Sequence, residues 1–236
     1  MLAPLSATTD ARMQEESMVP PDTAKAAVVT ALPRTTHPLI FEAAFAPATL
    51  AVQGADSLRF SVSDLGRLKS ESGTLVACDP INVHDAQGFA QLFPKGQFPV
   101  QLALARFRHD ERVAFSRVVF SAAPVVRWQL ATLPGQPPLA LDDAHTYCYP
   151  VDAGAGIFAD KQASDAFAAQ DQATWKAVFV TKAAENGYRG FLHPFGKYNL
   201  ATFSTGLGDG CYSSYIGYDR TGHVCRLLTD FGLVNW

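Results

Sequence analysis

The stretch CYSSYIGYDRTGHVCRLLTD, residues 211–230, decides the fold. Two runs rich in Tyr, Ile, Val and Leu, 211–218 and 223–230, flank the polar turn Asp219–Gly222. An Asp that opens a turn and a Gly that closes it are typical of a type I turn, so the stretch predicts an antiparallel hairpin. Placing Asp219 opposite Gly222 predicts the cross-strand pairs Tyr218–His223, Ile216–Cys225, Tyr215–Arg226 and Tyr212–Thr229.

Further strand patterns precede this hairpin. The segment SLRFSVS (57–63) alternates apolar and polar residues, as a half-buried strand does. The segments FPVQLALAR (98–106) and RVAFSRVVF (112–120) flank a polar turn and predict an antiparallel pair. Four more segments have strand character: 73–78, 125–132, 147–152 and 199–204.

A helical insert interrupts the strands. Asp160 is placed to cap a helix over 161–170. Apolar residues recur at three- and four-residue spacing across 173–186, and Gly187 ends that helix. Together these elements predict a mainly β (α+β) fold, an antiparallel β-sandwich-like domain with a short helical insert near 160–187.

The first 36 residues differ from the rest of the chain. They are rich in Ala, Thr, Pro and Ser, and only Thr23–Ala31 has the pattern of a short helix. We expect residues 1–36 to form a poorly ordered arm. No domain linker is found between residues 57 and 236, and residues 37–236 are expected to form a single mainly β domain.

Composition and charge exclude several classes of protein. With 48% apolar and 17% charged residues, the chain has the composition of a domain with a sizeable core. The net charge of -3 lacks the basic excess of nucleic-acid-binding domains, and no window approaches the ~18 apolar residues of a membrane span. We therefore expect no nucleic acid and no membrane as partners, and a cytoplasmic location. In that compartment the four cysteines are expected to be free thiols: Cys78, Cys148, Cys211 and Cys225.

Four segments carry a resemblance to a known family: SGTLVACDPI (72–81), FPKGQFPVQLALARF (93–107), YPVDAGAGIFAD (149–160) and STGLGDGCYSSYIGYDRTG…LLTDF (204–231). Together they resemble the bacterial family called domain of unknown function 4241 (DUF4241), over residues of about 57–234. The resemblance implies no established catalytic residue, cofactor or partner. A role in bacterial conflict or toxin immunity is a hypothesis that comes from this association alone.

Aspartates concentrate in the late segments. Asp152, Asp209 and Asp230 are candidate metal ligands, because carboxylate oxygens hold Ca²⁺ and Mg²⁺. With His84 as base or further ligand, they would form a metal-dependent hydrolase-type enzyme. The alternative is that each Asp caps a turn or a helix through backbone hydrogen bonds. No cofactor is predicted apart from this divalent cation.

The candidate binding residues lie in the same segments. The surface with the GDGxY hairpin and the VDAGAG loop would present Asp152, Asp209, Tyr212, Asp219, Asp230 and Arg127. The chain has no GxSxG nucleophile motif and no phosphate-binding loop, and the glycines of GLGDG (206–210) are best explained by a tight bend. The favoured function is therefore a non-enzymatic binding module for a protein or a small ligand, with the metal-dependent enzyme as the alternative.

Overall fold

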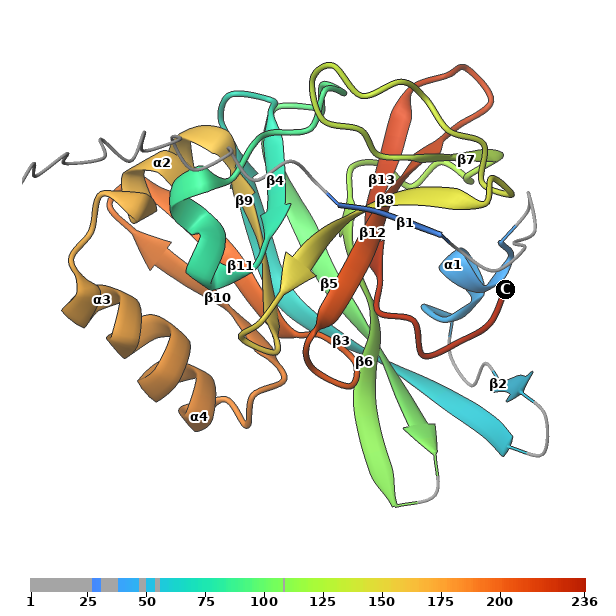
Figure 1. The fold of residues 1–236 in the computed structure, drawn as a ribbon, viewed down its shortest axis with the longest axis horizontal. Coiled ribbons are helices and arrows are strands. Elements are labelled where there is room, and N and C mark those ends of the chain that lie inside the picture. The colour runs from blue at the N-terminus through green and yellow to red at the C-terminus, as the bar shows by residue number, and fades with distance from the viewer. Residues whose placement is uncertain (1–26, 31–37, 47–49, 54–55, 108) are drawn as a thin grey trace, which may run out of the picture.

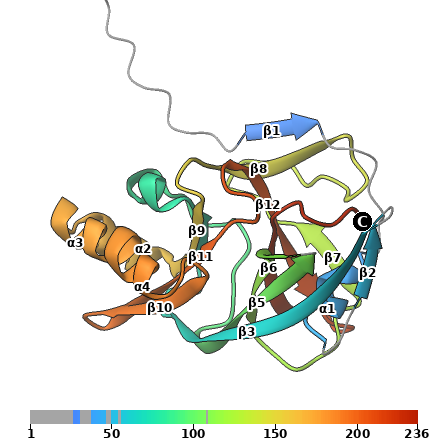
Figure 2. The ribbon, with the colours of Figure 1, turned by 90° about the horizontal axis from the view of Figure 1, so that it is seen from below.

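Two antiparallel β-sheets pack face to face, with helices on the outer side of the smaller sheet (Figures 1 and 2). The computed structural model describes residues 27–30, 38–46, 50–53, 56–107 and 109–236. Within them the chain is mostly antiparallel strand, so the predicted sandwich-like α+β fold is confirmed. None of the helices in this part of the chain has the length and apolar content needed to cross a membrane.

The larger sheet has the order β1-β8-β12-β13-β6-β5-β3-β2, and β7 also pairs with β12. Its long central strands come from the segments whose alternating pattern predicted strands, and the β5–β6 pair is antiparallel as expected. The strands of this sheet are β1 (Ala27–Thr30), β2 (Leu50–Gln53), β3 (Asp56–Ser70), β5 (Gly96–Phe107), β6 (Asp110–Val119), β7 (Arg127–Leu130), β8 (His145–Val151), β12 (Gly210–Tyr218) and β13 (Val224–Asp230).

The smaller sheet has the order β10-β11-β9-β4, and the predicted helical insert covers it. Asp160 caps α2 by accepting a hydrogen bond from the Gln162 N–H at 2.9 Å, as expected. Gly187 has a φ of 61° and ends the second helical segment. The elements are β4 (Leu75–Cys78), β9 (Ala155–Asp160), β10 (Gly190–Phe195), β11 (Tyr198–Ser204), α2 (Lys161–Ala168), α3 (Gln172–Lys176), a π-helical turn (Ala177–Lys182) and α4 (Ala183–Glu185).

Three apolar clusters hold these layers together. The first lies between the sheets and includes Leu102, Phe158, Phe203, Ile216 and Leu227. A second covers the other face of the larger sheet, and a third packs the helices onto the smaller sheet. Both faces of each sheet therefore bury side chains, and each of the three clusters removes apolar area from water.

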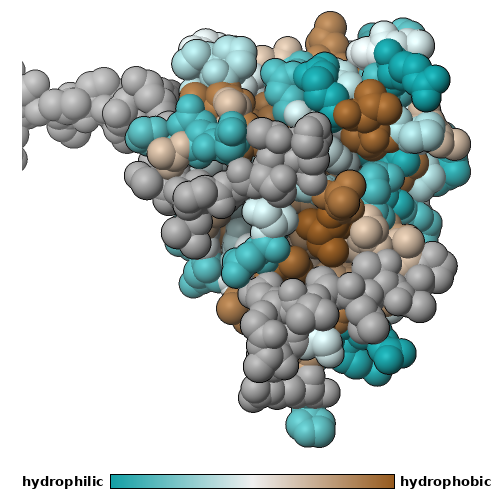
Figure 3. Space-filling model, turned by 90° about the vertical axis from the view of Figure 1, so that its right-hand side faces the viewer, coloured by the Kyte–Doolittle hydropathy of each residue, from teal (hydrophilic) through white to brown (hydrophobic). Residues whose placement is uncertain are grey.

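A short helix, α1 (Ile40–Ala43), is held against the larger sheet by ion pairs. The Glu42 carboxylate accepts hydrogen bonds from Arg226 at 3.1 and 3.2 Å and from Arg117 at 3.2 Å. Burial lowers the pKa of Arg117 to about 10, against the opposing effect of Glu42. Figure 3 views the side of the molecule that carries α1 and the C-terminus, where hydrophobic residues are visible among hydrophilic ones.

The predicted hairpin exists, but its predicted register is wrong. The turn bond from the Gly222 N–H to the Asp219 carbonyl is present at 3.0 Å, yet the Asp219 N–H pairs with the His223 carbonyl. A bulge between Gly217 and Tyr218 then shifts the ladder by one further residue. The observed pairs include Tyr218–Val224, Ile216–Leu227, Tyr215–Leu228 and Ser214–Thr229. A bulge adds one residue to one strand, and the sequence pattern did not indicate it.

The structure also differs from the sequence prediction in three segments whose residue pattern did not indicate a strand. Ala27–Thr30, part of the expected helix Thr23–Ala31, forms a strand instead, because it pairs with the edge of β8. The rest of the expected arm, 1–26 and 31–36, lies outside the described residues. The expectation also missed β9, which begins in the small-residue run AGAG, and β10, which contains Pro194.

The expectation of four free thiols is wrong for two of the cysteines. Cys148 of β8 and Cys211 of β12 form a disulfide, with their Cα atoms 5.3 Å apart. Cys78 and Cys225 are free and buried. The bonded cysteines are 63 residues apart in the chain, and only the pairing of β8 with β12 brings them together.

We predict that the double variant Cys148→Ser/Cys211→Ser unfolds with a free energy about 2–4 kcal/mol lower than that of the native chain, because the disulfide closes a long loop in the unfolded state. Urea denaturation measures this. Dithiothreitol should lower the free energy of unfolding of the native chain to that of the variant and should leave the value for the variant unchanged. Equal stability of the two proteins without reductant would contradict the prediction.

Candidate functional site

The buried carboxylate of Asp79, at the end of β4, organises two chain segments. One oxygen accepts the Ile81 N–H at 2.7 Å and thereby starts the 3₁₀ turn Pro80–Asp85. The other accepts the N–H groups of Asp152 at 2.6 Å and Ala153 at 2.8 Å. The Asp79 side chain is fully buried, and three N–H donors replace the water that a carboxylate would otherwise need.

The VDAGAG loop follows β8 and lies against the GLGDG turn. Gly154 has a φ of 59°, and its carbonyl accepts the Thr205 N–H at 3.2 Å. A Cβ on Gly156 would meet the Phe203 ring at 2.7 Å and the Tyr149 hydroxyl at 3.0 Å. Glycine is therefore favoured at 154 by the positive φ and at 156 by the lack of space for a side chain.

The GLGDG bend is stabilised by Tyr212. Its hydroxyl donates to the Gly208 carbonyl at 2.7 Å, and burial raises the pKa of this phenol. Gly206 and Gly208 have φ values of 53° and 115°, which favour glycine. The structural interpretation of these glycines is thus confirmed.

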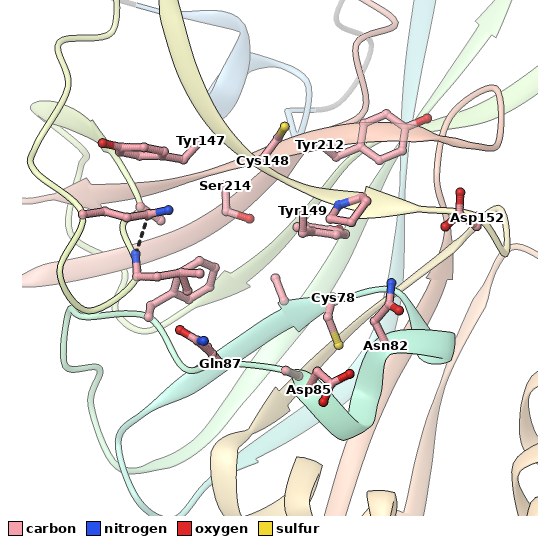
Figure 4. Close-up of a pocket in the computed structure, with 17 residues that line it drawn as sticks. Cys78, Asn82, Asp85, Gln87, Tyr147, Cys148, Tyr149, Asp152, Tyr212 and Ser214 are labelled. Carbon is pink, nitrogen blue, oxygen red and sulfur yellow. Dashed lines mark hydrogen bonds between the residues drawn. The ribbon is translucent and has the colours of Figure 1, made fainter. Parts of the chain in front are cut away.

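A pocket of about 250 Å³ opens beside the inter-sheet core, where the segments around Asp79 and the VDAGAG loop meet β12 (Figure 4). The segment from β4 to Phe89 forms one wall, and β8 and β12 form another. Aromatic side chains and amides are its main constituents. The lining residues are Ala77, Cys78, Asn82, Asp85, Ala86, Gln87, Phe89, Ala131, Leu133, Gln136, Tyr147, Cys148, Tyr149, Pro150, Asp152, Tyr212 and Ser214.

Several polar groups of this pocket have no partner among the described residues. The Tyr149 hydroxyl is buried and makes no hydrogen bond there. The nearby Thr229 hydroxyl is bonded instead to Ser214, at 2.8 Å. Burial raises the pKa of Tyr149 far above its ordinary value, with a smaller opposing effect of Thr229. The hydroxyl has no accessible surface and lies beside Gly156 at the inter-sheet core, so it is an unpaired group of the core and not a contact for a ligand in the open pocket.

The structure brings two of the predicted binding residues, Asp152 and Tyr212, into this one pocket. Asp209 is exposed on the neighbouring bend. Like Asp209, the other three candidates lie outside the lining. Asp219 caps the hairpin turn by accepting N–H bonds from Thr221 at 2.8 Å and His223 at 3.0 Å.

The remaining two candidates have structural partners. Asp230 is buried and accepts hydrogen bonds from the Gly232 N–H and the Trp236 indole N–H, each at 2.8 Å. Arg127 stacks over the Tyr218 ring at 4.1 Å. The alternative interpretation of the aspartates as turn and helix caps therefore holds for Asp160, Asp219 and Asp230.

The predicted metal cluster does not form. Among the residues that the structure describes, which include Asp152, Asp209 and Asp230, no group of three or more His, Cys, Asp or Glu side chains is placed to hold a metal ion. His84 lines a different hollow, beside Trp175. The enzyme alternative required these groups to converge on one cleft. Asp152 lines the pocket, whereas Asp230 is hydrogen-bonded to Gly232 and Trp236 of the C-terminal segment.

The fold and the pocket define a class: a two-sheet β protein with an aromatic, partly acidic pocket at the edge of its inter-sheet core. Residues 68–229 match the family described as "Protein of unknown function (DUF4241)", and the chain belongs to that family. The match lies within the range of the predicted resemblance. No curated protein and no solved structure matches the chain.

Sequence reasoning missed half of the pocket. Asn82, Asp85 and Gln87 follow the ACDP motif, in a segment to which no element was assigned. Tyr149 was included only as part of a strand. A signal was present, since an Asp-Pro step opens this irregular polar segment, and Asp at such a step commonly binds backbone N–H groups.

We predict that Asp79→Asn lowers the free energy of unfolding by about 2–4 kcal/mol, because an amide cannot accept all three N–H groups in either orientation. Chemical denaturation monitored by Trp fluorescence measures the change. Asp209→Asn, at an exposed aspartate, is the matched control and should change stability by less than about 0.5 kcal/mol. Equal effects of the two substitutions would contradict this role of Asp79.

We further predict that the melting temperature is the same in EDTA and in added Ca²⁺, Mg²⁺, Mn²⁺ or Zn²⁺, since no group of three ligand side chains is found among the described residues. A cation bound only by the folded state at ~100 times its Kd would add about 2.7 kcal/mol. A metal-specific rise that Asp209→Ala or Asp152→Ala removes would show that this prediction is wrong.

Proposed function

We propose that the chain is a binding module that holds a small polar organic molecule in the Asp79-supported pocket. The observation that carries the proposal is the convergence of three family-like segments, SGTLVACDPI, YPVDAGAGIFAD and STGLGDGCY, on this one hollow. Ligand sites are typically concave and mainly apolar, with a few well-placed polar groups. At about 250 Å³, the volume lies just below the usual range of about 300–1,000 Å³ and fits a molecule of metabolite size.

The lining polar groups support ligand binding. The side chains of Asn82, Asp85, Gln87 and Asp152 make no hydrogen bond with the described residues, and all four reach the pocket (Figure 4). Tyr149, Tyr212 and Phe89 provide aromatic surface beside them. Rigid aromatic walls with adaptable amides give shape selection and directed hydrogen bonds together.

Binding is favoured over catalysis because Cys78, the cysteine thiol that lines the pocket and is not in the disulfide, is held in its protonated form. Cys78 is buried, and burial together with the charge of Asp79 raises the pKa of its thiol far above the ordinary value. The thiolate is the reactive form of cysteine. The described lining residues include no histidine that could act as its base.

Partners and location stay predictions from the sequence. These predictions are a protein partner, a role in bacterial conflict or immunity, and the absence of nucleic-acid binding. For nucleic acid, the lack of Lys and Arg among the described pocket residues favours the expectation. For the cytoplasmic location, the Cys148–Cys211 disulfide is contrary evidence, since disulfides persist in oxidising compartments.

We predict that a mixed library of small polar fragments contains binders that ligand-observed NMR detects with the native chain. Gln87→Trp should weaken these binders at least tenfold, since the exposed Gln87 lines the pocket and an indole would fill it. Gln97→Trp, at an exposed glutamine of β5 outside the pocket, is the matched control and should leave binding unchanged. No binder at all, or equal loss in both variants, would overturn the proposed function.

A further inference from the structure

The charged side chains that line the pocket all have the same sign. Asp85 comes from the end of the 3₁₀ turn and Asp152 from the VDAGAG loop. No Lys, Arg or His occurs among the described residues of the lining. A cleft lined by one sign of charge attracts the opposite charge, and its low-dielectric walls strengthen this attraction.

Neither carboxylate is neutralised within the described part of the protein. Asp165 and Asp110 illustrate the contrast, because they pair with Lys161 and Arg112. Asp85 and Asp152 make no such ion pair, and both are exposed at the pocket rim. Two unpaired carboxylates in one concave lining make the site negative, and a cation bound there would be attracted by both.

The same buried group fixes the segments that carry both carboxylates. Asp79 holds the Asp152 N–H with one oxygen and starts the turn that leads to Asp85 with the other. Asp79 also adds a third negative charge behind the pocket. This charge contributes to the raised pKa values of Cys78 and Tyr149, after the larger effect of burial. The potential at the pocket floor is therefore negative as well.

The remaining lining groups suit a cation that donates hydrogen bonds. The rings of Tyr147, Tyr149 and Tyr212 line the pocket, and a cation over an aromatic face is stabilised by the ring quadrupole. Asn82 and Gln87 line the pocket and offer amide oxygens as acceptors. Figure 4 labels Asn82 and Asp85, which belong to the 3₁₀ turn, and Gln87, which follows it.

We infer that the ligand of this pocket carries an ammonium or guanidinium group, which Asp85 and Asp152 bind beside the tyrosine rings. The inference rests on the proposed binding function and specifies its ligand class. A free amine and the side chain of a lysine or arginine in a peptide share this chemistry. Anionic ligands are excluded by charge, and neutral polyols lack the ion pair.

The test compares ligands of equal shape and different charge. Isothermal titration calorimetry of the native chain measures n-pentylamine, 1-pentanol and pentanoate, together with 1,5-diaminopentane, agmatine and a capped Gly-Lys-Gly peptide. At least one amine or guanidine should bind at least tenfold more tightly than 1-pentanol, and pentanoate should not bind. Raising the salt concentration should weaken the binding of the cationic ligand and leave the binding of 1-pentanol unchanged.

Charge-neutral variants identify the residues. Asp85→Asn/Asp152→Asn should weaken cation binding at least tenfold. Asp142→Asn/Glu185→Gln is the matched control, since it removes the same net charge at exposed positions outside the pocket, and it should leave binding unchanged. Binding of the peptide would assign the cation to a protein side chain, and binding of the free amines alone would assign it to a metabolite.

The failures of the two proposals are distinct. If neutral fragments bind the native chain as tightly as amines do, and Asp85→Asn/Asp152→Asn does not weaken them, the cation inference is wrong and the binding function stands. If neither amines nor the fragment library bind, the proposed function is wrong and the inference falls with it. Equal weakening of amine binding in both double variants would also overturn the assignment to Asp85 and Asp152.

Discussion

The buried carboxylate of Asp79 is the contact on which the pocket depends. It accepts three backbone N–H groups from two segments that are about 70 residues apart in the chain, so one side chain positions both the 3₁₀ turn and the VDAGAG loop. A buried carboxylate is stable only when donors replace its water. The two segments supply those donors, and in return their irregular backbone is held in one arrangement.

The sheets place this contact where it can support a site. Along β12 the side chains of Tyr212 and Ile216 belong to the inter-sheet core, while Tyr215 faces the cluster that contains α1. This alternation follows from the two-residue period of a strand. The Cys148–Cys211 disulfide joins β8 to β12 directly beside Tyr149 and Tyr212. The aromatic wall of the pocket is therefore built on two strands that are paired, cross-linked and packed on both faces.

Binding in such a pocket would combine rigidity with unpaired polar groups. The walls are fixed by Asp79, by the disulfide and by the hydroxyl of Tyr212, which closes the GLGDG bend. The carboxylates of Asp85 and Asp152 and the amides of Asn82 and Gln87, by contrast, make no hydrogen bond with the described residues. A preorganised site loses little conformational entropy when its ligand binds, which is the physical basis for the binding function proposed above.

The sequence by itself determined the elements with strong local patterns. Alternating apolar residues predicted β3, β5, β6, β12 and β13, and the Asp160 cap and the Gly187 stop predicted the helical insert. Two residues of the family-like motifs, Asp152 and Tyr212, both line the pocket. These signals are local: periodicity, caps and turn residues act within a few positions of the chain.

Only the tertiary structure decided the contacts between distant residues. The bulge at Gly217 and the Cys148–Cys211 bond follow from strand pairing, which no single segment encodes. The same holds for Asp79, whose role depends on N–H groups from another loop. A carboxylate has one chemical character in the sequence, and its partners decide whether it caps a turn, supports a pocket or stays free for a ligand.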